Sequence, residues 1–250
     1  MNCYDNISPE SFWLIRSAHY DKLFWTKDKG YLEEIVRSSD LKKEHIVLDV
    51  GTGTGAVKDA IKNYVRHVVA IDSSDAMLKK GNWTGTSIVK WDINDALFKD
   101  GIFDRVFARM VFHHITDNLD RAILRCYDVL KEKGKICVAE GVPPLDDQDV
   151  VDWYTEMFKL KETRRTFTPE ILVNYLSKNG FKNMAVHVHY MENFSIVNWV
   201  KNSGLQKRVQ SEILDIHINA PKKIKEAYKM RITGNDCLIT SKNVIVIGKK

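Results

Sequence analysis

The chain has 250 residues, with 44% hydrophobic and 28% charged side chains, an ordinary composition for one globular domain over residues 1–250. Its 13 glycines and 5 prolines exclude a collagen-like chain and a chain that is disordered because it is rich in Gly and Pro. No apolar run reaches the roughly 18 residues that a membrane span needs. The formal net charge of +5 is too mild to indicate a nucleic-acid binder by itself.

The cysteines and the first residues bear on where the protein resides. The four cysteines, Cys3, Cys126, Cys137 and Cys237, contain no C-x-x-C pair, so the sequence offers no zinc or redox motif of that kind. The opening residues MNCYDNISPE hold no apolar segment of the type that directs export. A reduced, cytoplasmic protein is therefore expected.

Helical stretches at about 11–27 and 31–38 come first in the chain. Short apolar runs rich in β-branched residues then alternate with helical stretches, as expected of strands that are covered on both faces. These predicted strands are 46–50, 67–71, 87–89, 105–108 and 135–139. The clearest predicted helix, 118–133, has apolar residues at helical spacing and is followed by Gly134. The alternation predicts a parallel sheet with right-handed crossovers.

The alternation breaks after residue 139, where an aromatic-rich stretch follows. A helix is predicted from Thr168-Pro169 to Asn179-Gly180, then a strand at 181–190, two or three amphipathic helices within 195–231, and a last strand at 243–247. We therefore predict a doubly wound, Rossmann-like α/β fold with a seven-stranded, mostly parallel sheet and helices on both faces. The N-terminal helices at 11–38 and the insertions 141–167 and 193–232 are expected to form a helical lid that binds the substrate.

The most informative segment is VLDVGTGTG, where the first strand meets a helix. Its glycines, Gly51, Gly53 and Gly55, let the backbone turn tightly and approach a ligand. A dinucleotide site has the spacing G-x-G-x-x-G, whereas the spacing here is G-x-G-x-G with Asp49 just before it. A carboxylate would repel a pyrophosphate but would offset the charge of an ammonium or sulfonium group. The turn therefore favours an aminoacyl-type nucleoside over NAD.

Two further acids follow the neighbouring strands. Asp72 ends the second predicted strand, where a carboxylate can accept hydrogen bonds from ribose hydroxyls. Asp92 follows the third strand and could accept a hydrogen bond from an adenine amine, with Ile93 against the ring. Because the carboxyl ends of parallel strands meet at one edge of a sheet, Asp49, Asp72 and Asp92 together predict a nucleoside site there.

With these motifs the chain resembles the class I S-adenosylmethionine-dependent methyltransferases, in the branch that methylates small molecules such as quinone precursors and natural products. The matching segments are VLDVGTGTG, AIDSSDAML, WDIND, FDRVFARMVFHHITD and LKEKGKICVAEG, with FTPEILVNYLSKNGF as a looser match. The resemblance covers about residues 17–190, with 243–248 as the last strand. It implies transfer of a methyl group from S-adenosyl-L-methionine to a small-molecule acceptor by in-line displacement, which releases S-adenosylhomocysteine.

The resemblance also implies roles for particular residues. Asp49 and the glycine-rich turn would hold the methionine half of the cofactor, Asp72 the ribose, and Asp92 with Ile93 the adenine. Tyr20, in the segment SAHYD, could close over the cofactor. The full implied set of cofactor-binding residues is Tyr20, Asp49, Gly51, Thr52, Gly53, Gly55, Asp72, Asp92, Ile93 and, through its backbone carbonyl, Arg109.

Candidate catalytic residues follow the fourth and fifth strands. A methyl group on a sulfonium is already activated, so the protein mainly aligns the reactants and excludes water, and a base is needed only where the acceptor holds a proton. His113 is the candidate base, because a neutral imidazole suits pH 7, and Glu140 could orient it or stabilise its charge. The alternative is that one of His113 and His114 packs under the loop while the other only shapes the pocket.

Other readings of the sequence remain. An RNA or protein methyltransferase would use the basic stretch 221–231, which a solvated helix face also explains. Nucleic acid is disfavoured because no Asn-Pro-Pro-Tyr segment follows the fourth strand and no Pro-Cys nucleophile is present. A nicotinamide oxidoreductase or a non-catalytic nucleoside-binding relative would share the same layout. His187 and His189 share a strand face without further ligands, so no metal is expected. The oligomeric state and the acceptor stay open.

Overall fold

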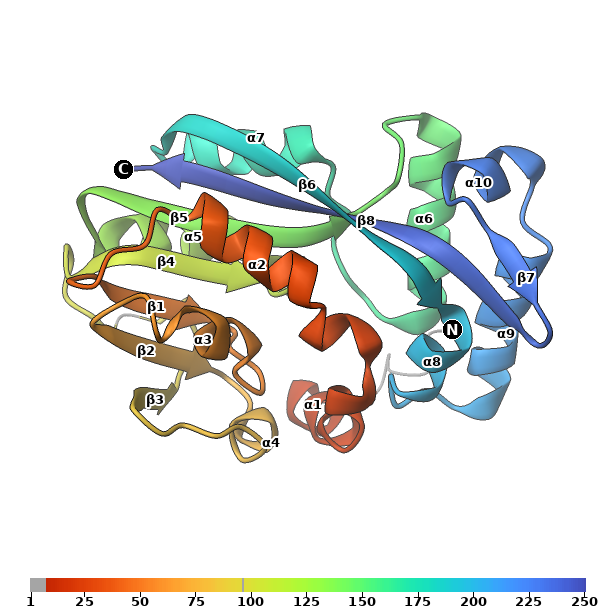
Figure 1. Ribbon diagram of the computed structural model, residues 1–250, viewed down its shortest axis with the longest axis horizontal. Coiled ribbons are helices and arrows are strands. Elements are labelled where there is room, and N and C mark those ends of the chain that lie inside the picture. Colours follow the sequence, from red (N-terminus) through yellow and green to blue (C-terminus); the bar gives the residue numbers. More distant parts are fainter. Residues whose placement is uncertain (1–7, 96) are drawn as a thin grey trace.

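A computed structural model describes residues 8–95 and 97–250 of the chain. Within these residues the strands form one sheet in the order β3-β2-β1-β4-β5-β8-β6, with β7 paired to β8 (Figure 1). The strands are β1 (Ile46–Val50), β2 (His67–Asp72), β3 (Thr86–Lys90), β4 (Phe103–Arg109), β5 (Leu130–Val142), β6 (Lys182–Ser195), β7 (Arg231–Thr233) and β8 (Asp236–Lys249). Strands β1 to β5 pair in parallel, and β8 pairs antiparallel with both β5 and β6. The doubly wound, mostly parallel α/β sheet predicted from the sequence is confirmed.

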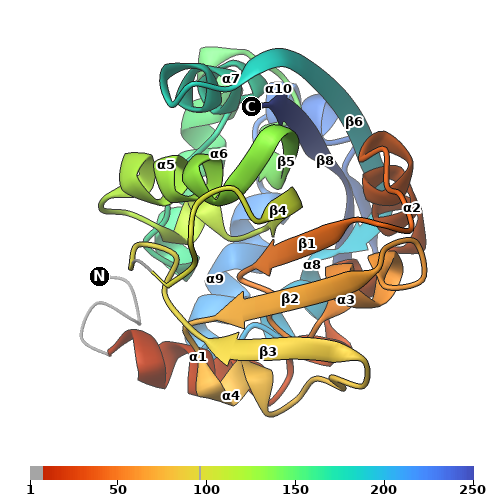
Figure 2. The ribbon, with the colours of Figure 1, turned by 90° about the vertical axis from the view of Figure 1, so that its left-hand side faces the viewer.

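Helices lie on both faces of the sheet (Figure 2). The α-helices are α1 (Pro9–Ser17), α2 (Lys29–Ser38), α3 (Ala56–Ile61), α4 (Asp75–Leu78), α5 (Leu119–Val129), α6 (Gln148–Lys161), α7 (Pro169–Lys178), α8 (Ile196–Lys201), α9 (Lys207–Ile218) and α10 (Lys222–Ala227). Alternate side chains of each strand enter two apolar cores. Val47 and Phe107 belong to the core shared with α2 and α3, whereas Leu48 and Val106 belong to the core shared with α5 and α7. This two-sided burial explains why the central strands read as nearly continuous apolar runs.

Several predicted boundaries change in the structure. The last two predicted strands, 181–190 and 243–247, are longer and run over Lys182–Ser195 and Asp236–Lys249. The predicted helix 118–133 ends at Val129, because Leu130 is fully buried and pairs with Phe103 as the first residue of β5. The predicted helix 11–27 ends at Ser17 and continues as two 3-10 turns at Tyr20–Lys22 and Phe24–Lys27. The sheet has an eighth strand, since Arg231–Thr233, at the end of the predicted helical region, pairs with β8 as β7.

The segments 141–167 and 193–232 gather at one end of the sheet. Helices α6, α8, α9 and α10 stand beyond the carboxyl ends of the parallel strands, on the right of Figure 1. Their apolar side chains, among them Tyr154, Trp199 and Ile213, join the same core as α2 and α3. No helix among the described residues is long and apolar enough to cross a membrane. Cys3 lies outside the described residues, and the other three cysteines are buried and unpaired.

Candidate functional site

The glycine-rich turn adopts a conformation that side chains rarely allow. Gly51, Gly53 and Gly55 have φ angles of 61°, 59° and 93°, in the left-handed region that glycine enters without steric cost. At Gly51 a Cβ atom would lie 2.3 Å from the Cγ2 of Val111, which is too close for any side chain. The backbone N–H of Thr52 donates to the carbonyl of Ile71 at 3.0 Å and so ties the turn to β2.

Asp49 lies beneath the turn and does not line the groove above it. The residue is 1% exposed, and its Oδ2 accepts a hydrogen bond of 2.6 Å from the Thr52 hydroxyl. Burial raises the pKa of Asp49 to about 7, against the lowering effect of the Thr52 hydrogen bond. Thr52 and Gly55 also belong to the turn but do not line the groove. Asp49, Thr52 and Gly55 therefore shape the groove without forming its wall.

Asp72 lies at the carboxyl end of β2 with its carboxylate held by the backbone. Its Oδ2 accepts from the N–H of Gly53 and its Oδ1 from the N–H of Ser74, both at 2.8 Å. Burial raises its pKa, while the Ser74 and Gly53 hydrogen bonds oppose the rise. Each carboxylate oxygen has a second lone pair, so an oriented pair of acceptors remains for a ligand in the groove.

A groove of about 1120 Å³, partly open to solvent, runs along the carboxyl ends of β1, β2 and β3. Six of the predicted cofactor-binding residues line it: Tyr20, Gly51, Gly53, Asp72, Asp92 and Ile93. The exposed Asp92 accepts from the backbone and side-chain nitrogens of Asn94, at 2.8 and 3.1 Å, and Ile93 is buried beside it. A carboxylate next to an apolar wall matches the amine edge and the face of an adenine.

Arg109, the remaining predicted residue, directs its side chain away from the groove. Its guanidinium donates to the carbonyls of Thr26 at 3.1 Å and Trp25 at 2.9 Å. The guanidinium carbon also lies 5.1 Å from the ring centroid of Tyr31. The side chain therefore fastens the 3-10 turns that carry Tyr20 and Trp25 to the end of β4.

A second cavity, here called the chamber, adjoins the groove beneath α6 and α8. It measures about 830 Å³ and shares Trp13, Tyr20, Met110 and His114 with the groove. Its walls include Trp25, Tyr154, Phe158, Phe194 and Trp199. Met110 at the junction has a φ of 56° and donates its N–H to Ala139 at 2.7 Å; such strain in a non-glycine residue is typical of functional sites. The groove and the chamber form two compartments with a common wall.

His113 and Glu140 are brought together behind the chamber. The Nδ1 of His113 lies 2.6 Å from Oε2 of Glu140, and the backbone N–H of His113 donates to Oε1 at 3.3 Å. Burial raises the pKa of Glu140 to about 7, and burial, with Arg164 nearby, lowers the pKa of His113 well below its ordinary value. His113 lines the chamber, whereas Glu140 is fully buried behind it and reaches the chamber only through the imidazole.

His114 lies at the junction of the two compartments. Its ring is 4.0 Å from that of His113 and packs edge-on against Trp13, with the ring centroids 4.8 Å apart. Burial, with His113 next to it, lowers the pKa of His114 well below its ordinary value. Both histidines are therefore neutral at pH 7, and His114 has the position nearer to the groove.

Four charged side chains at the chamber were not among the residues predicted from the sequence: Arg16, Lys161, Glu162 and Arg164. Arg16 and Lys161 both contact Oε2 of Glu162, the lysine at 2.5 Å, and Arg164 lies 3.6 Å from Oε1. In the sequence the run LKETRR looks like the solvated end of a helix. The one available signal was the concentration of charge next to the aromatic residues of the same segment.

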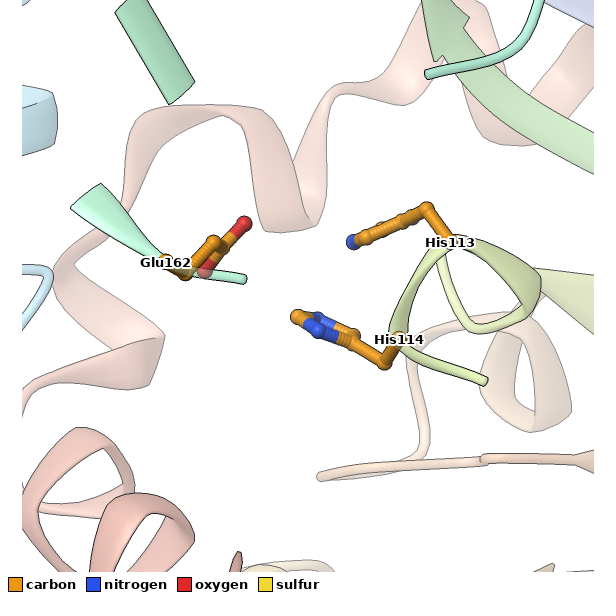
Figure 3. Close-up of side chains that lie close together, drawn as sticks. All are labelled: His113, His114 and Glu162. Atoms are coloured by element: carbon orange, nitrogen blue, oxygen red, sulfur yellow. The ribbon is translucent and has the colours of Figure 1, made fainter. Parts of the chain in front are cut away.

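Glu162 also faces the two histidines. Figure 3 shows the rings of His113 and His114 and the carboxylate of Glu162 pointing toward one another. The ring nitrogens and carboxylate oxygens that could coordinate a metal lie within 4.8 Å of one another. Such spacing could hold a metal ion, but the three cations around Glu162 would repel one. His187 and His189, in contrast, serve the packing of β6 on α2, because they lie 3.4 Å from Glu34 and 3.0 Å from Asp28.

The sequence and the fold were compared with those of known proteins. Residues 48–138 match the methyltransferase domain family. This match and the relatives below support a class I S-adenosylmethionine-dependent methyltransferase. The uncharacterized methyltransferase YcgJ of Bacillus subtilis is 26% identical over 199 residues, which are 74% of this chain and 75% of that protein. Its crystal structure superposes with a TM-score of 0.76 at 18% identity, covering 88% of this chain and 98% of that one.

Two further matches are with methyltransferases whose names give a substrate. A demethylmenaquinone methyltransferase of Thermotoga maritima is 36% identical over 104 residues, covering 39% of this chain and 44% of that protein. A phosphoethanolamine N-methyltransferase of Haemonchus contortus, solved with phosphomonomethylethanolamine and S-adenosylhomocysteine, superposes with a TM-score of 0.65 at 17% identity, covering 97% of this chain and 60% of that one. The family implies S-adenosylmethionine as the methyl donor.

The groove fits that donor. A Cβ at Gly53 would lie 3.3 Å from Met77 Cε and 3.9 Å from Tyr20 Cε1, so a side chain there would fill the space between the turn and Tyr20. The acceptor oxygens of Asp72 suit ribose hydroxyls, and Asp92 with Ile93 suits an adenine. The residues that line the groove therefore fit a nucleoside.

Proposed function

We propose that the protein transfers a methyl group from S-adenosylmethionine to a small-molecule acceptor held in the chamber. The observation that carries this proposal is the common wall of Trp13, Tyr20, Met110 and His114 between the nucleoside groove and the chamber. A donor in the groove and an acceptor in the chamber would meet at this wall. The donor supplies an activated methyl group on a sulfonium, so alignment of the two reactants supplies much of the catalysis.

The residues of the chamber support a small acceptor. Helices α6 and α8 cover it with aromatic side chains, including Tyr154, Phe158 and Trp199, which exclude water and would pack on a flat molecule. The expected lid, residues 11–38, 141–167 and 193–232, would open to admit the acceptor. We expect His113, oriented by Glu140, to accept the proton of an acceptor that must lose one.

The alternative of an RNA or protein substrate has less support. The basic stretch after Pro221 forms only the short helix α10, and Lys223 lies 2.6 Å from both Asp147 and Asp149, which offset its charge. Ile224 and Tyr228 of the same stretch are buried. A small-molecule acceptor also agrees with the quinone named for the Thermotoga maritima relative.

Calorimetric titration with S-adenosylmethionine, S-adenosylhomocysteine and NAD tests the donor half of the proposal. We expect binding of both adenosyl compounds, no binding of NAD, and at least a tenfold weaker affinity in Asp72→Ala, since about 1.4 kcal/mol of hydrogen bonding corresponds to a factor of ten. Asp75→Ala is the matched control, because Asp75 is exposed and paired with Lys90 at 2.9 Å. Equal affinity in Asp72→Ala, with unchanged thermal unfolding, would remove Asp72 from the ribose site.

Incubation of the protein with a pool of small metabolites and S-adenosylmethionine labelled at the methyl group tests the acceptor half. We expect label in a small product and S-adenosylhomocysteine in equal amount. Donor binding without any transfer, over a broad pool, would favour the non-catalytic alternative. Label in RNA or protein added to the same reaction would favour a macromolecular substrate.

A further inference from the structure

The chamber holds more positive than negative charge. Arg16, Lys161 and Arg164 surround the single carboxylate of Glu162, and the side chains of all four are at most 5% exposed. The remaining acid near them, Glu140, is engaged by His113 and has a pKa of about 7. Burial, with Arg16 nearby, likewise lowers the pKa of Lys161 to about 7, whereas the two guanidinium groups stay charged and outnumber the carboxylate of Glu162. His113 and His114 add no negative charge. An excess of buried positive charge lowers the stability of the folded protein unless an anion binds beside it.

Two of these cations also have unused hydrogen-bond donors. The Nε of Arg16 and the Nη2 of Arg164 are buried and have no partner among the described residues. Burying a donor without an acceptor costs free energy, so a ligand that supplies an acceptor to these groups would be bound more tightly. Both arginines line the chamber, where the acceptor would bind.

Aromatic faces keep the cations in place. The guanidinium carbon of Arg164 lies 4.2 Å from the ring centroid of Phe158, and that of Arg16 lies 5.3 Å from Trp13. The Nζ of Lys161 lies 5.4 Å from the ring of Trp199. Stacking leaves the edge of a guanidinium free to donate to a carboxylate or a phosphate. Polar recognition and aromatic packing therefore meet in the same chamber.

We propose that the acceptor is a small molecule with an anionic group, a carboxylate or a phosphate, bound by Arg16 and Arg164 with Lys161, and with a flat apolar body packed on the aromatic wall. This inference rests on the proposed methyl transfer and narrows its acceptor. A cationic acceptor or a divalent metal ion at Glu162 would add to the excess of positive charge. A neutral acceptor could accept these hydrogen bonds but would leave the excess of positive charge without a counter-ion.

The test is calorimetric binding of three probes of similar size to the protein saturated with S-adenosylhomocysteine. The probes are benzoate, phenyl phosphate and benzyl alcohol. We expect at least one of the two anions to bind ten or more times more tightly than the alcohol. Benzoate alone would assign a carboxylate, phenyl phosphate alone a phosphate, and both together a site that accepts either group. Equal binding of the alcohol and both anions would overturn the proposal.

Substitutions of the charged chamber residues test which side chains bind the anion. Arg164→Met should weaken the preferred anion at least tenfold and leave benzyl alcohol unchanged, and Lys161→Met should do the same to a smaller degree. Lys159→Met is the matched control, because Lys159 is on the same helix but exposed and paired with Glu156 at 2.5 Å. Unchanged anion binding in a folded Arg164→Met protein would also overturn the proposal.

The same samples separate this proposal from the proposed function. If S-adenosylhomocysteine binds and the anions do not, the methyltransferase proposal stands and the anionic acceptor is wrong. If S-adenosylhomocysteine itself fails to bind, the proposed function fails first. Should Arg164→Met not fold, the preference of the wild-type protein among the three probes decides the question.

Discussion

The Nδ1 atom of His113 lies 2.6 Å from Oε2 of Glu140, so the state of this carboxyl determines which ring nitrogen carries the proton. A protonated Glu140 donates to Nδ1 and leaves the proton on Nε2, whereas an ionised Glu140 accepts from Nδ1–H and frees the Nε2 lone pair. Because burial raises the pKa of Glu140 to about 7, we expect the Nε2 lone pair of His113 to be free to accept a proton only above that pH.

Nitrogen NMR of the imidazoles should therefore show the proton of His113 moving from Nε2 to Nδ1 as the pH rises through about 7. In Glu140→Gln the step should disappear, because the amide does not titrate. His217 is the internal control, since its Nδ1 faces the backbone carbonyl of Ile213 at 2.6 Å, a partner without a titration. One tautomer of His113 on both sides of neutral pH would contradict the assigned pair.

Gly51→Ala should destabilise the fold and abolish donor binding. A positive φ costs alanine about 1–2 kcal/mol, and the clash of its Cβ with Val111 adds about 1–3 kcal/mol. Gly85→Ala isolates the first effect, because Gly85 has a φ of 74° and nothing within 4 Å of the Cβ position. Urea unfolding measures both variants. Equal losses in the two would show that the turn accommodates the clash.

Tyr20 should act through its ring and not through its hydroxyl. The ring lies over Gly53 and packs edge-on against Trp25, with the centroids 5.7 Å apart. Tyr20→Phe should keep donor affinity within about twofold, and Tyr20→Ala should weaken it about tenfold, since an aromatic contact contributes about 0.5–1.5 kcal/mol. Calorimetric titration decides, and a loss as large in Tyr20→Phe would indicate a hydrogen bond from the hydroxyl.

Glu162→Gln should destabilise the protein by about 3–5 kcal/mol at neutral pH, because it leaves the buried guanidinium groups of Arg16 and Arg164 without their counter-ion. Glu156 is an exposed acid in α6, the helix that ends just before Glu162. Glu156→Gln should change stability by at most about 1 kcal/mol. Lys161 and Arg16 hold the pKa of Glu162 well below its ordinary value, despite burial. Its stabilising effect is therefore complete above about pH 4.5 and declines as the pH falls below that.

Denaturant unfolding at several pH values checks this prediction. The stability of the wild-type protein and of Glu162→Gln should converge as the pH falls below about 4.5, toward the folded-state pKa of Glu162. A difference that does not change with pH would mean that the substitution acts through packing instead of charge.

The strands and the groove at their carboxyl ends were predictable because their signals are local. Residues 46–50 are apolar at nearly every position since both sheet faces are covered, and the glycines after them occupy left-handed positions. Asp72 and Asp92 follow neighbouring strands, and parallel pairing necessarily brings the ends of such strands together. For Asp49 the local pattern was less informative, because it does not distinguish a carboxylate on the groove wall from one buried beneath the turn.

The limits of local patterns appear at the ends of elements. Helical periodicity continued through Leu130, where pairing with Phe103 starts β5 instead. Helix propensity is a weak preference that a tertiary contact overrides. The end of α5 therefore depended on pairing with β4, which the spacing of apolar residues does not reveal.

The amino-acid sequence by itself determined the sheet, the glycine-rich turn and the acids at the strand ends, because each depends on neighbours within a few residues. Only the tertiary structure decided the chamber and its charge. Arg16 and Glu162, which pair inside it, stand 146 residues apart in the chain, and each resembles a solvated helix residue in its own segment. Burial gathers these charges in the chamber, and burial is set by what packs over them.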